Sequence, residues 1–296
     1  MKYTRALCLC VVAIFLELQP AACQNSGVNP PSDAQNKGFT SYVQFQGSSN
    51  SLGQIMDLDT RVGYNFSQHF GVDGGVPIYF VRGTTSTGDY SNNGLGNLYG
   101  DLRVTYKNPI VNYSTVLTGY APTADTKHGL STGRATFDWN NRFDRPFGRL
   151  TPFLEAGLGN SIQNSPLFNR PFTTLGFNSH FEGGTEYSLM RVLGVGLSAY
   201  AIVPSGQQKI YSKVLAAGSA GQASSHNRFF TTSPQVTGDA DLTKDHGFSG
   251  WVDAHPTPFT DLLLGYTHSV GYDLNTVSFG LGVNVGYLVH QHNGTR

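Results

Sequence analysis

Two groups of acidic and histidine residues have spacings that could support hydrolysis. Asp253 and His255 stand two residues apart in "WVDAHP", and His180, Glu182 and Glu186 lie together in another stretch. Residues two apart on a strand point the same way but about 7 Å apart, too far for a direct hydrogen bond. A hydrolase also needs a nucleophile that contacts its base, and the sequence has neither a G-x-S-x-G turn nor an H-E-x-x-H helix. We therefore predict no catalytic residues.

The cysteines and the other histidines give no sign of a metal or cofactor site. All three cysteines lie in the first 23 residues, so the rest of the chain has no thiol and no disulfide. The histidines are scattered without the spacing of metal ligands: His128, His226, His246, His290 and His292. The sequence predicts no metal and no cofactor.

The elements that would position these side chains are strands, because apolar residues alternate with small or polar ones. In "TVSFGLGVNVGYLV", residues 276–289, the odd positions are all apolar, and this period of two indicates a strand with one apolar face. About twelve segments follow the pattern, each near or above the ~10 residues that a tilted membrane strand needs. Their predicted spans are 38–48, 54–66, 70–83, 95–107, 110–121, 131–143, 149–162, 175–188, 191–204, 246–256, 261–272 and 275–290.

The apolar faces could pack on a second sheet or face lipid, and the connections favour lipid. Short connections such as "NP" and "LM" alternate along most of the chain with long ones such as "TTSTGDYSNNG" and "QNSPLFNRPFT". Outer-membrane barrels have short periplasmic turns and long outer loops. We therefore predict an all-β fold, a transmembrane antiparallel β-barrel of about twelve strands. The longest connection, 205–245, could fold inward or lie outside, and its Ala, Gly and Ser content favours mobility over a rigid plug.

Aromatic residues recur at the strand ends beside the short turns, on the apolar parity. Amphipathic rings favour the headgroup level of a membrane, so this position indicates a periplasmic aromatic girdle. Its members are Phe39, Phe66, Phe70, Tyr106, Phe143, Tyr187 and Tyr287.

The opposite parity carries charges of both signs, with acids in excess. In a barrel these side chains face the lumen, where they either pair across strands and order the interior or form a polar pore that selects small solutes. The candidate lumen-lining residues are Asp57, Asp59, Arg61, Asp101, Arg103, Lys107, Arg134, Asp138, Arg142, Glu155, Glu182 and Glu186.

The N-terminus has the pattern of an export signal. Lys2 and Arg5 precede the apolar run "ALCLCVVAIFL", and small residues up to Cys23 follow. Acylation of Cys23 is a weaker alternative, because Pro20 stands where a leucine is usual. We predict a signal peptide at 1–23, a flexible periplasmic lead-in at 24–37, a barrel at 38–290 with its long outer loop at 205–245, and a tail at 291–296.

The net charge and the export signal limit the partners that we expect. The formal net charge is zero, so no basic field attracts nucleic acid. We expect the chain in the outer membrane of a Gram-negative-type cell, in contact with lipid, the barrel-assembly machinery and a small solute that the sequence does not identify.

Two neighbouring stretches, "NNGLGNLYGDLRVTYK" and "TGYAPTADTKHGLSTGRATFDW", resemble outer-membrane barrels of the MetA-pathway of phenol degradation family. In that family a "GLGD" stretch opens one strand and a "PTGD…GLGTG" stretch crosses an outer loop. Here Asn97 stands in place of the Asp and Ala124 in place of a Gly. The resemblance implies passage of small compounds, with apolar or aromatic ones suggested.

We therefore expect a barrel for passive or facilitated passage of small molecules. A non-conducting structural or adhesive barrel is the first alternative, and a barrel hydrolase is the second.

Overall fold

The computed structural model describes residues 37–85, 88–215, 229–231 and 233–288. The predicted signal peptide, the lead-in up to residue 36 and the tail at 291–296 lie outside these residues. Among the described residues, no helix is both long and apolar enough to cross a membrane.

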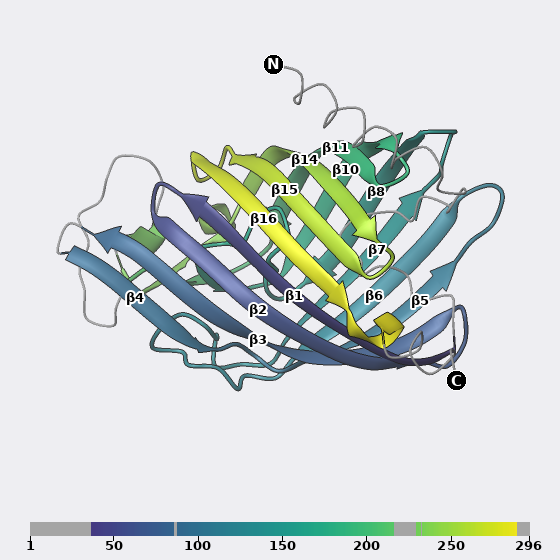
Figure 1. The fold of residues 1–296 in the computed structure, drawn as a ribbon. Coiled ribbons are helices and arrows are strands. Elements are labelled where there is room, and N and C mark those ends of the chain that lie inside the picture. Colours follow the sequence, from purple (N-terminus) through teal and green to yellow (C-terminus); the bar gives the residue numbers. More distant parts are fainter. Residues whose placement is uncertain (1–36, 86–87, 216–228, 232, 289–296) are drawn as a thin grey trace, which may run out of the picture.

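Thirteen strands form one antiparallel sheet that closes on itself (Figure 1). Neighbouring strands pair around the barrel, and β16 pairs back onto β1, so the ring closes. The short strand β4 pairs on one side only, with β3. The strands are β1 (Gly38–Asn50), β2 (Gly53–Asn65), β3 (Phe70–Thr85), β4 (Gly88–Leu95), β5 (Tyr99–Tyr106), β6 (Asn112–Tyr120), β7 (Thr136–Asp144), β8 (Leu150–Gly159), β10 (Asn178–Met190), β11 (Leu193–Pro204), β14 (Asp245–Thr257), β15 (Thr260–Ser269) and β16 (Leu274–Asn284).

Strands β4 and β5 share one place in the ring. One half of β3 pairs with β4 and the other half with β5, so the thirteen strands occupy twelve positions. The predicted barrel of about twelve strands is confirmed. The predicted long loop "TTSTGDYSNNG" is wrong, because β3 and β4 continue as a hairpin in which Thr85 faces Gly88. Its residues are mostly polar or small and lack the apolar alternation that marks the other strands.

Several predicted strands are shorter in the structure, most of all at the start of β7 and the end of β16. β7 begins at Thr136 rather than at residue 131, and the residues before it belong to the connection that follows β6. β16 ends at Asn284 rather than at residue 290, and residues 285–288 form a helical turn. The side chain of Asn284 accepts a hydrogen bond from the Tyr287 N–H at 2.9 Å, which caps this turn.

The predicted alternation of faces is clearest in β16. Val277 and Phe279 on the outer face are 52% and 38% exposed, whereas Thr276 and Ser278 on the inner face are fully buried. A strand has this pattern when one face points out of the barrel and the other into its lumen.

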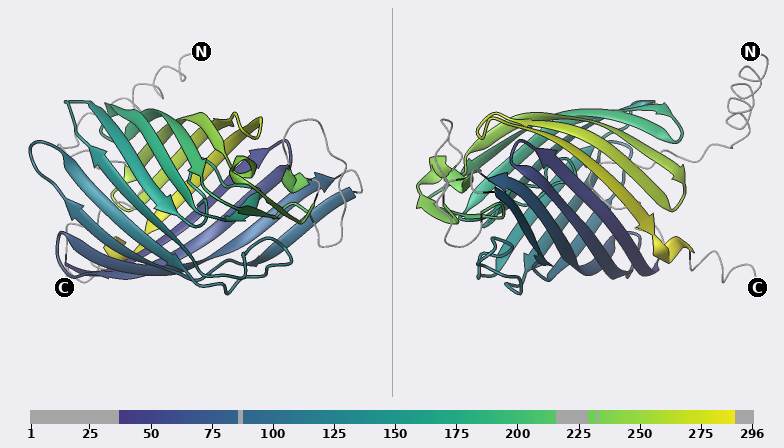
Figure 2. Two further views of the ribbon diagram at one scale, coloured as in Figure 1. Left: turned by 180° about the vertical axis from the view of Figure 1, so that it is seen from behind. Right: turned by 60° about the vertical axis from the view of Figure 1, so that its left-hand side comes forward.

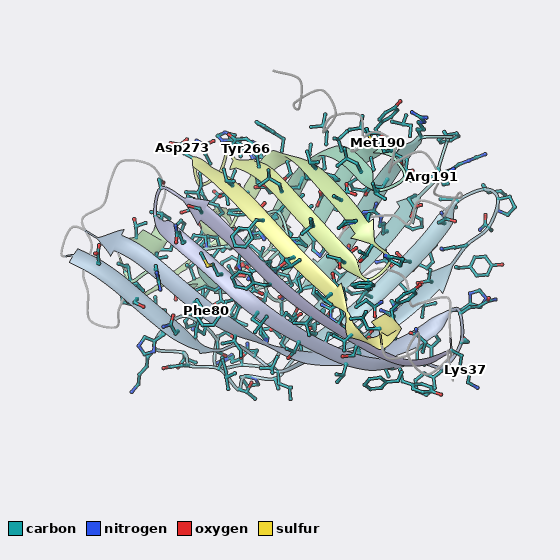
Figure 3. All side chains as sticks on the ribbon, viewed as in Figure 1. Lys37, Phe80, Met190, Arg191, Tyr266 and Asp273 are labelled. Atoms are coloured by element: carbon teal, nitrogen blue, oxygen red, sulfur yellow. The ribbon has the colours of Figure 1, made fainter. Side chains whose placement is uncertain are left out.

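The two ends of the barrel differ in their connections. One end has only short turns, at residues 66–69, 107–111, 145–149, 191–192 and 258–259. The other end carries the long connections at 121–135, 160–177 and 205–244, together with the short β1–β2 and β15–β16 turns. Figure 3 shows Lys37 and Arg191 at the short-turn end and Asp273 at the opposite end.

A small sheet covers the long-loop end, and Figure 2 shows its green segments gathered there. It consists of β9 (Phe172–Leu175), β12 (Gln208–Ser212) and β13 (Gln235–Gly238), with two short 3-10 helices, η2 (Phe229–Thr231) and η3 (Ala240–Leu242). The described parts of the 205–245 segment thus form regular structure, and its Ala-, Gly- and Ser-rich stretch at 216–228, on which the expectation of mobility rested, lies outside the described residues. β12 pairs with β9 from a different connection, and local composition carries no sign of such a partner.

Candidate functional site in the barrel lumen

Ten of the twelve predicted lumen-lining residues lie on barrel strands and are buried or half-buried. These are Asp57, Asp59, Arg61, Asp101, Arg103, Asp138, Arg142, Glu155, Glu182 and Glu186. Lys107 and Arg134 lie elsewhere. Lys107 directly follows β5 and Arg134 precedes β7, and both side chains are exposed because the strands do not extend to them.

The predicted girdle residues lie at the short-turn end, and all but Tyr287 are on strands or next to them. Phe39, Phe66, Phe70, Tyr106, Phe143 and Tyr187 are between 39% and 56% exposed at strand ends or beside them. The rings of Phe66 and Phe70 stack with centroids 5.5 Å apart. Tyr287 is half-buried in the helical turn after β16, not on a strand.

Four charged residues near the short-turn end form the Arg142 cluster, which we define as Arg142, Asp144, Glu155 and Glu186. The guanidinium group donates to Glu155 Oε1 at 2.7 Å and to Glu186 Oε1 at 2.8 Å, and its Nε lies 3.9 Å from Asp144 Oδ1. The same group lies over the ring of Phe153, 4.1 Å from its centroid. The cluster joins β7, β8 and β10, and Arg142 is only 4% exposed. Such a compensated buried network orders the wall.

His255 lies between two carboxylates, closer than the spacing predicted. Its Nε2 is 3.3 Å from Asp253 Oδ2, and its Nδ1 is 2.5 Å from Asp261 Oδ1. The two side chains on β14 lean toward each other, so their tips are closer than the roughly 7 Å between positions two apart on a strand. Both ring nitrogens face carboxylates rather than a hydroxyl nucleophile, so this is not the arrangement of a hydrolase. Across the described residues, no three His, Cys, Asp or Glu side chains are placed to hold a metal ion.

Residues 161–171, between β8 and β9, run across the lumen, and we call them the crossing segment. Asn169 donates from its backbone to Ser48 Oγ at 2.9 Å and from its side chain to Asp57 Oδ1 at 2.8 Å. The carbonyl of Leu167 accepts a bond from Thr267 Oγ1 at 2.9 Å. The segment leaves β8 and is bonded to β1, β2 and β15, on the far side of the ring. The predicted outer loop "QNSPLFNRPFT" is therefore largely a constriction.

An apolar core, the mouth cluster, fastens the crossing segment to the small sheet and to the barrel wall. The rings of Phe172 and Phe230 lie 4.8 Å apart, and those of Phe172 and Tyr272 lie 5.0 Å apart. Burial of such side chains stabilises by about 1.5–3 kcal/mol each. Its buried members are Ile55, Val81, Phe168, Phe172, Ile210, Val214, Phe230, Leu242, Tyr272 and Leu274.

Lys213 is a buried lysine in the small sheet's connection, outside the barrel strands. It is 1% exposed, and its Nζ donates to the carbonyl of Arg170 at 3.1 Å and lies 4.9 Å from the centroid of the Tyr79 ring. Burial lowers the pKa of Lys213 to about 7, an effect that Asp57 opposes and Arg170 reinforces.

Between the crossing segment and the wall is a cavity of about 330 Å³, which we call the lumen cavity. Asn164 and Arg170 of the crossing segment line one side of it. The wall contributes acidic residues and tyrosines, including Asp57, Asp59, Asp101, Asp138, Glu155, Glu182, Tyr79, Tyr99, Tyr120 and Tyr200. The predicted charges of β2, β5, β7, β8 and β10 thus meet around one hollow.

Sequence reasoning missed the crossing segment and the tyrosines. The signal for the segment was "PLFNRPF", whose Leu and two Phe residues are unusual in a loop that faces only water. The tyrosines gave no such signal, because Tyr is a common strand former on either face.

No model of a known protein family and no curated protein matches this sequence. Among solved structures, the chain is similar to an outer-membrane channel from Pseudomonas putida F1, with a TM-score of 0.55 and 10% identity over 90% of this chain and 100% of that one. It is also similar to the NanC porin, with a TM-score of 0.46 and 7% identity, and to the KdgM porin, with a TM-score of 0.47 and 8% identity. These cover 81% and 82% of this chain and 98% of each porin. At such identities the likeness shows the fold, an outer-membrane-type β-barrel.

Proposed function

We propose that this protein is an outer-membrane channel that passes small solutes through its lumen. The observation that carries the proposal is the lumen cavity, a polar hollow inside a closed sheet whose outer face is apolar. A twelve-stranded barrel is wider than the eight-stranded kind, in which side chains fill the interior. The crossing segment narrows this path.

The apolar outer face also supports a membrane location. Exposed apolar residues such as Leu264 and Val277, at 59% and 52%, would have no cover in water. We propose that outer-membrane lipid covers this face and that the barrel-assembly machinery inserts it. The chain should fractionate with the outer membrane and migrate faster in SDS gels before boiling than after. Recovery as a detergent-free soluble monomer would contradict the proposal.

Planar lipid bilayers test the passage of solutes directly. The wild-type chain should give channel events of small conductance, because the crossing segment narrows the lumen. The Asn169→Ala variant should give larger events, because it removes the side-chain bond that holds the segment against Asp57. Failure of both proteins to conduct ions or release solute from liposomes would overturn the channel.

A second candidate is a non-conducting structural barrel. The observation in its favour is the mouth cluster, which joins the crossing segment, the small sheet and the wall at the long-loop end. The same bilayer experiment separates the two candidates: a channel conducts more when the segment is released, and a structural barrel stays silent until it unfolds.

The sequence resemblance to the MetA-pathway family narrows the proposed solutes. The MetA-pathway family resemblance suggests small apolar or aromatic compounds, and four tyrosines around the lumen cavity are suited to contact with a ring. Liposome uptake of a homologous series, from phenol to an aliphatic alcohol of similar size, tests whether a ring is preferred.

A further inference from the structure

Acidic side chains outnumber basic ones around the lumen cavity. Six carboxylates line it against the two guanidinium groups of Arg61 and Arg170, although the whole chain has equal numbers of acidic and basic residues. Arg61 pairs with Asp59 at 3.4 Å, Glu155 pairs with Arg142, and Asp138 lies 3.0 Å from His180 Nε2. The remaining carboxylates give the cavity a negative potential, which its low-dielectric walls strengthen.

Asp101 is a buried carboxylate of the cavity wall whose charge Arg61 and Arg103 offset only from a distance. It is 8% exposed, it lines the cavity, and no basic group among the described residues forms an ion pair with it within 4 Å. Thr118 donates a side-chain hydrogen bond to it, but its Oδ1 has no donor within the described part of the chain. Asp59 Oδ1 also lacks a donor. Buried carboxylate oxygens without donors are unfavourable, so a ligand that brings a donor and a positive charge would relieve them.

The same wall carries aromatic rings that already hold cations. Arg61 lies 5.5 Å from the centroid of the Tyr99 ring, and Lys213 lies 4.9 Å from that of Tyr79. The Tyr99 and Tyr120 rings are 5.9 Å apart and tilted by 45°. Tyrosine rings beside carboxylates suit an ammonium group, which gains from the ring faces and from the negative charge together.

We propose that the lumen cavity binds a small organic cation with an ammonium group, for which Asp101 is the counter-ion and Tyr99 and Tyr120 form the apolar wall. The volume of about 330 Å³ is near the lower end for small-molecule pockets, so it holds one small ligand. Anions are repelled by the acidic lining. The inference rests on the proposed function, since the lumen is the route by which solutes reach the cavity.

Three probes with the same ring and different charge test the site: benzylammonium, benzyl alcohol and benzoate. Isothermal titration calorimetry on the full chain in detergent should show benzylammonium binding at least tenfold tighter than benzyl alcohol, and no binding of benzoate. Asp101→Asn should weaken benzylammonium at least tenfold. The matched control is Asp241→Asn, which removes the same charge from an exposed position in η3, outside the cavity lining.

Equal affinity for benzylammonium and benzyl alcohol, or an unchanged affinity in Asp101→Asn, would overturn the cation site. Heat-modifiable gel mobility of each variant shows that it remains a folded barrel, so lost binding is not lost structure. Bilayer conductance without ligand separates this inference from the proposed function. Channel events without charge-selective binding overturn only the site, and charge-selective binding in a silent barrel overturns only the passage.

Discussion

The Arg142 cluster and the wall around Asp101 contain the same kinds of side chain but differ in how their charges are compensated. In the cluster, one guanidinium group bonds two carboxylates at 2.7 and 2.8 Å, and Asn140 donates to the second oxygen of Glu155 at 2.9 Å. In the cavity wall, Asp59 and Asp101 each keep an oxygen without a donor. The carboxylates of the Arg142 cluster are thus compensated within the cluster, whereas two carboxylates of the cavity wall are compensated only in part.

From the sequence, the lumen charges could either pair across strands or select solutes, and the difference in compensation distinguishes these two roles. Pairing across strands orders a barrel wall, and the Arg142 cluster does this for β7, β8 and β10. Carboxylates beside the lumen cavity that lack a basic partner remain free to attract a charged solute. If the proposed cation site is present, both uses occur in one lumen, and the choice between pairing and pore holds for single residues rather than for the whole interior.

The largest effect should follow from breaking the paired region. Arg142→Ala leaves Glu155 and Glu186 as uncompensated buried charges, which should lower the free energy of unfolding by about 3–5 kcal/mol. Urea unfolding in lipid vesicles measures the change. The exposed Arg149→Ala is the control and should change little. A loss under about 1 kcal/mol in Arg142→Ala would mean that the cluster does not hold the wall.

A smaller effect is expected where the crossing segment meets the wall. Asn169→Ala leaves Asp57 Oδ1 without that donor, at a cost of about 1–3 kcal/mol. Hydrogen exchange of residues 161–171 should accelerate. Gln163→Ala is the control, because its side-chain amide bonds within the segment, to the Ser161 carbonyl. Equal exchange in both variants would show that Asp57 does not anchor the segment.

Lys213 gives a pH dependence with a definite sign. Its pKa is about 7 when folded and near 10.5 when unfolded, so between these values only the unfolded chain binds the proton. The free energy of unfolding should therefore rise with pH across this window, by at most about 1.4 kcal/mol per pH unit, and this contribution should be flat below pH 7.

Lys213→Met should abolish this rise, while the exposed Lys244→Met should retain it. Unfolding at pH 6.5, 8 and 9.5 measures both variants. A wild-type curve that falls over this range would contradict the lowering of the Lys213 pKa by burial.

The smallest effect should be a gain in stability when the charge of Asp101 in the cavity wall is removed. Asp101→Asn removes a buried charge that lacks an ionic partner, so the unliganded barrel should become more stable, by about 1 kcal/mol. The thermal midpoint of the gel-mobility shift measures it. A variant less stable than wild type would place Asp101 with the structural charges of the Arg142 cluster.

Strand parity was predictable because it is local. Side chains on a strand alternate with a period of two, so Asp57, Asp101 and Glu155 could be assigned to the lumen from their neighbours alone. Where the local pattern weakens, the prediction fails: the polar β4 was read as a loop, and Lys107 and Arg134 were placed on strands that do not reach them. The contact of His255 with Asp261 was not predictable, because Asp261 lies on the neighbouring strand β15 and only strand pairing brings the two together.

The sequence alone determined the class of fold, the number of strand positions and most of the residues that face inward, since each follows from patterns a few residues long. The tertiary structure alone decided which carboxylates are compensated, where residues 161–171 cross the lumen, and that β9, β12 and β13 join. Those outcomes depend on partners far apart in the chain, such as Asp57 and Asn169, which only closure of the barrel brings within 2.8 Å.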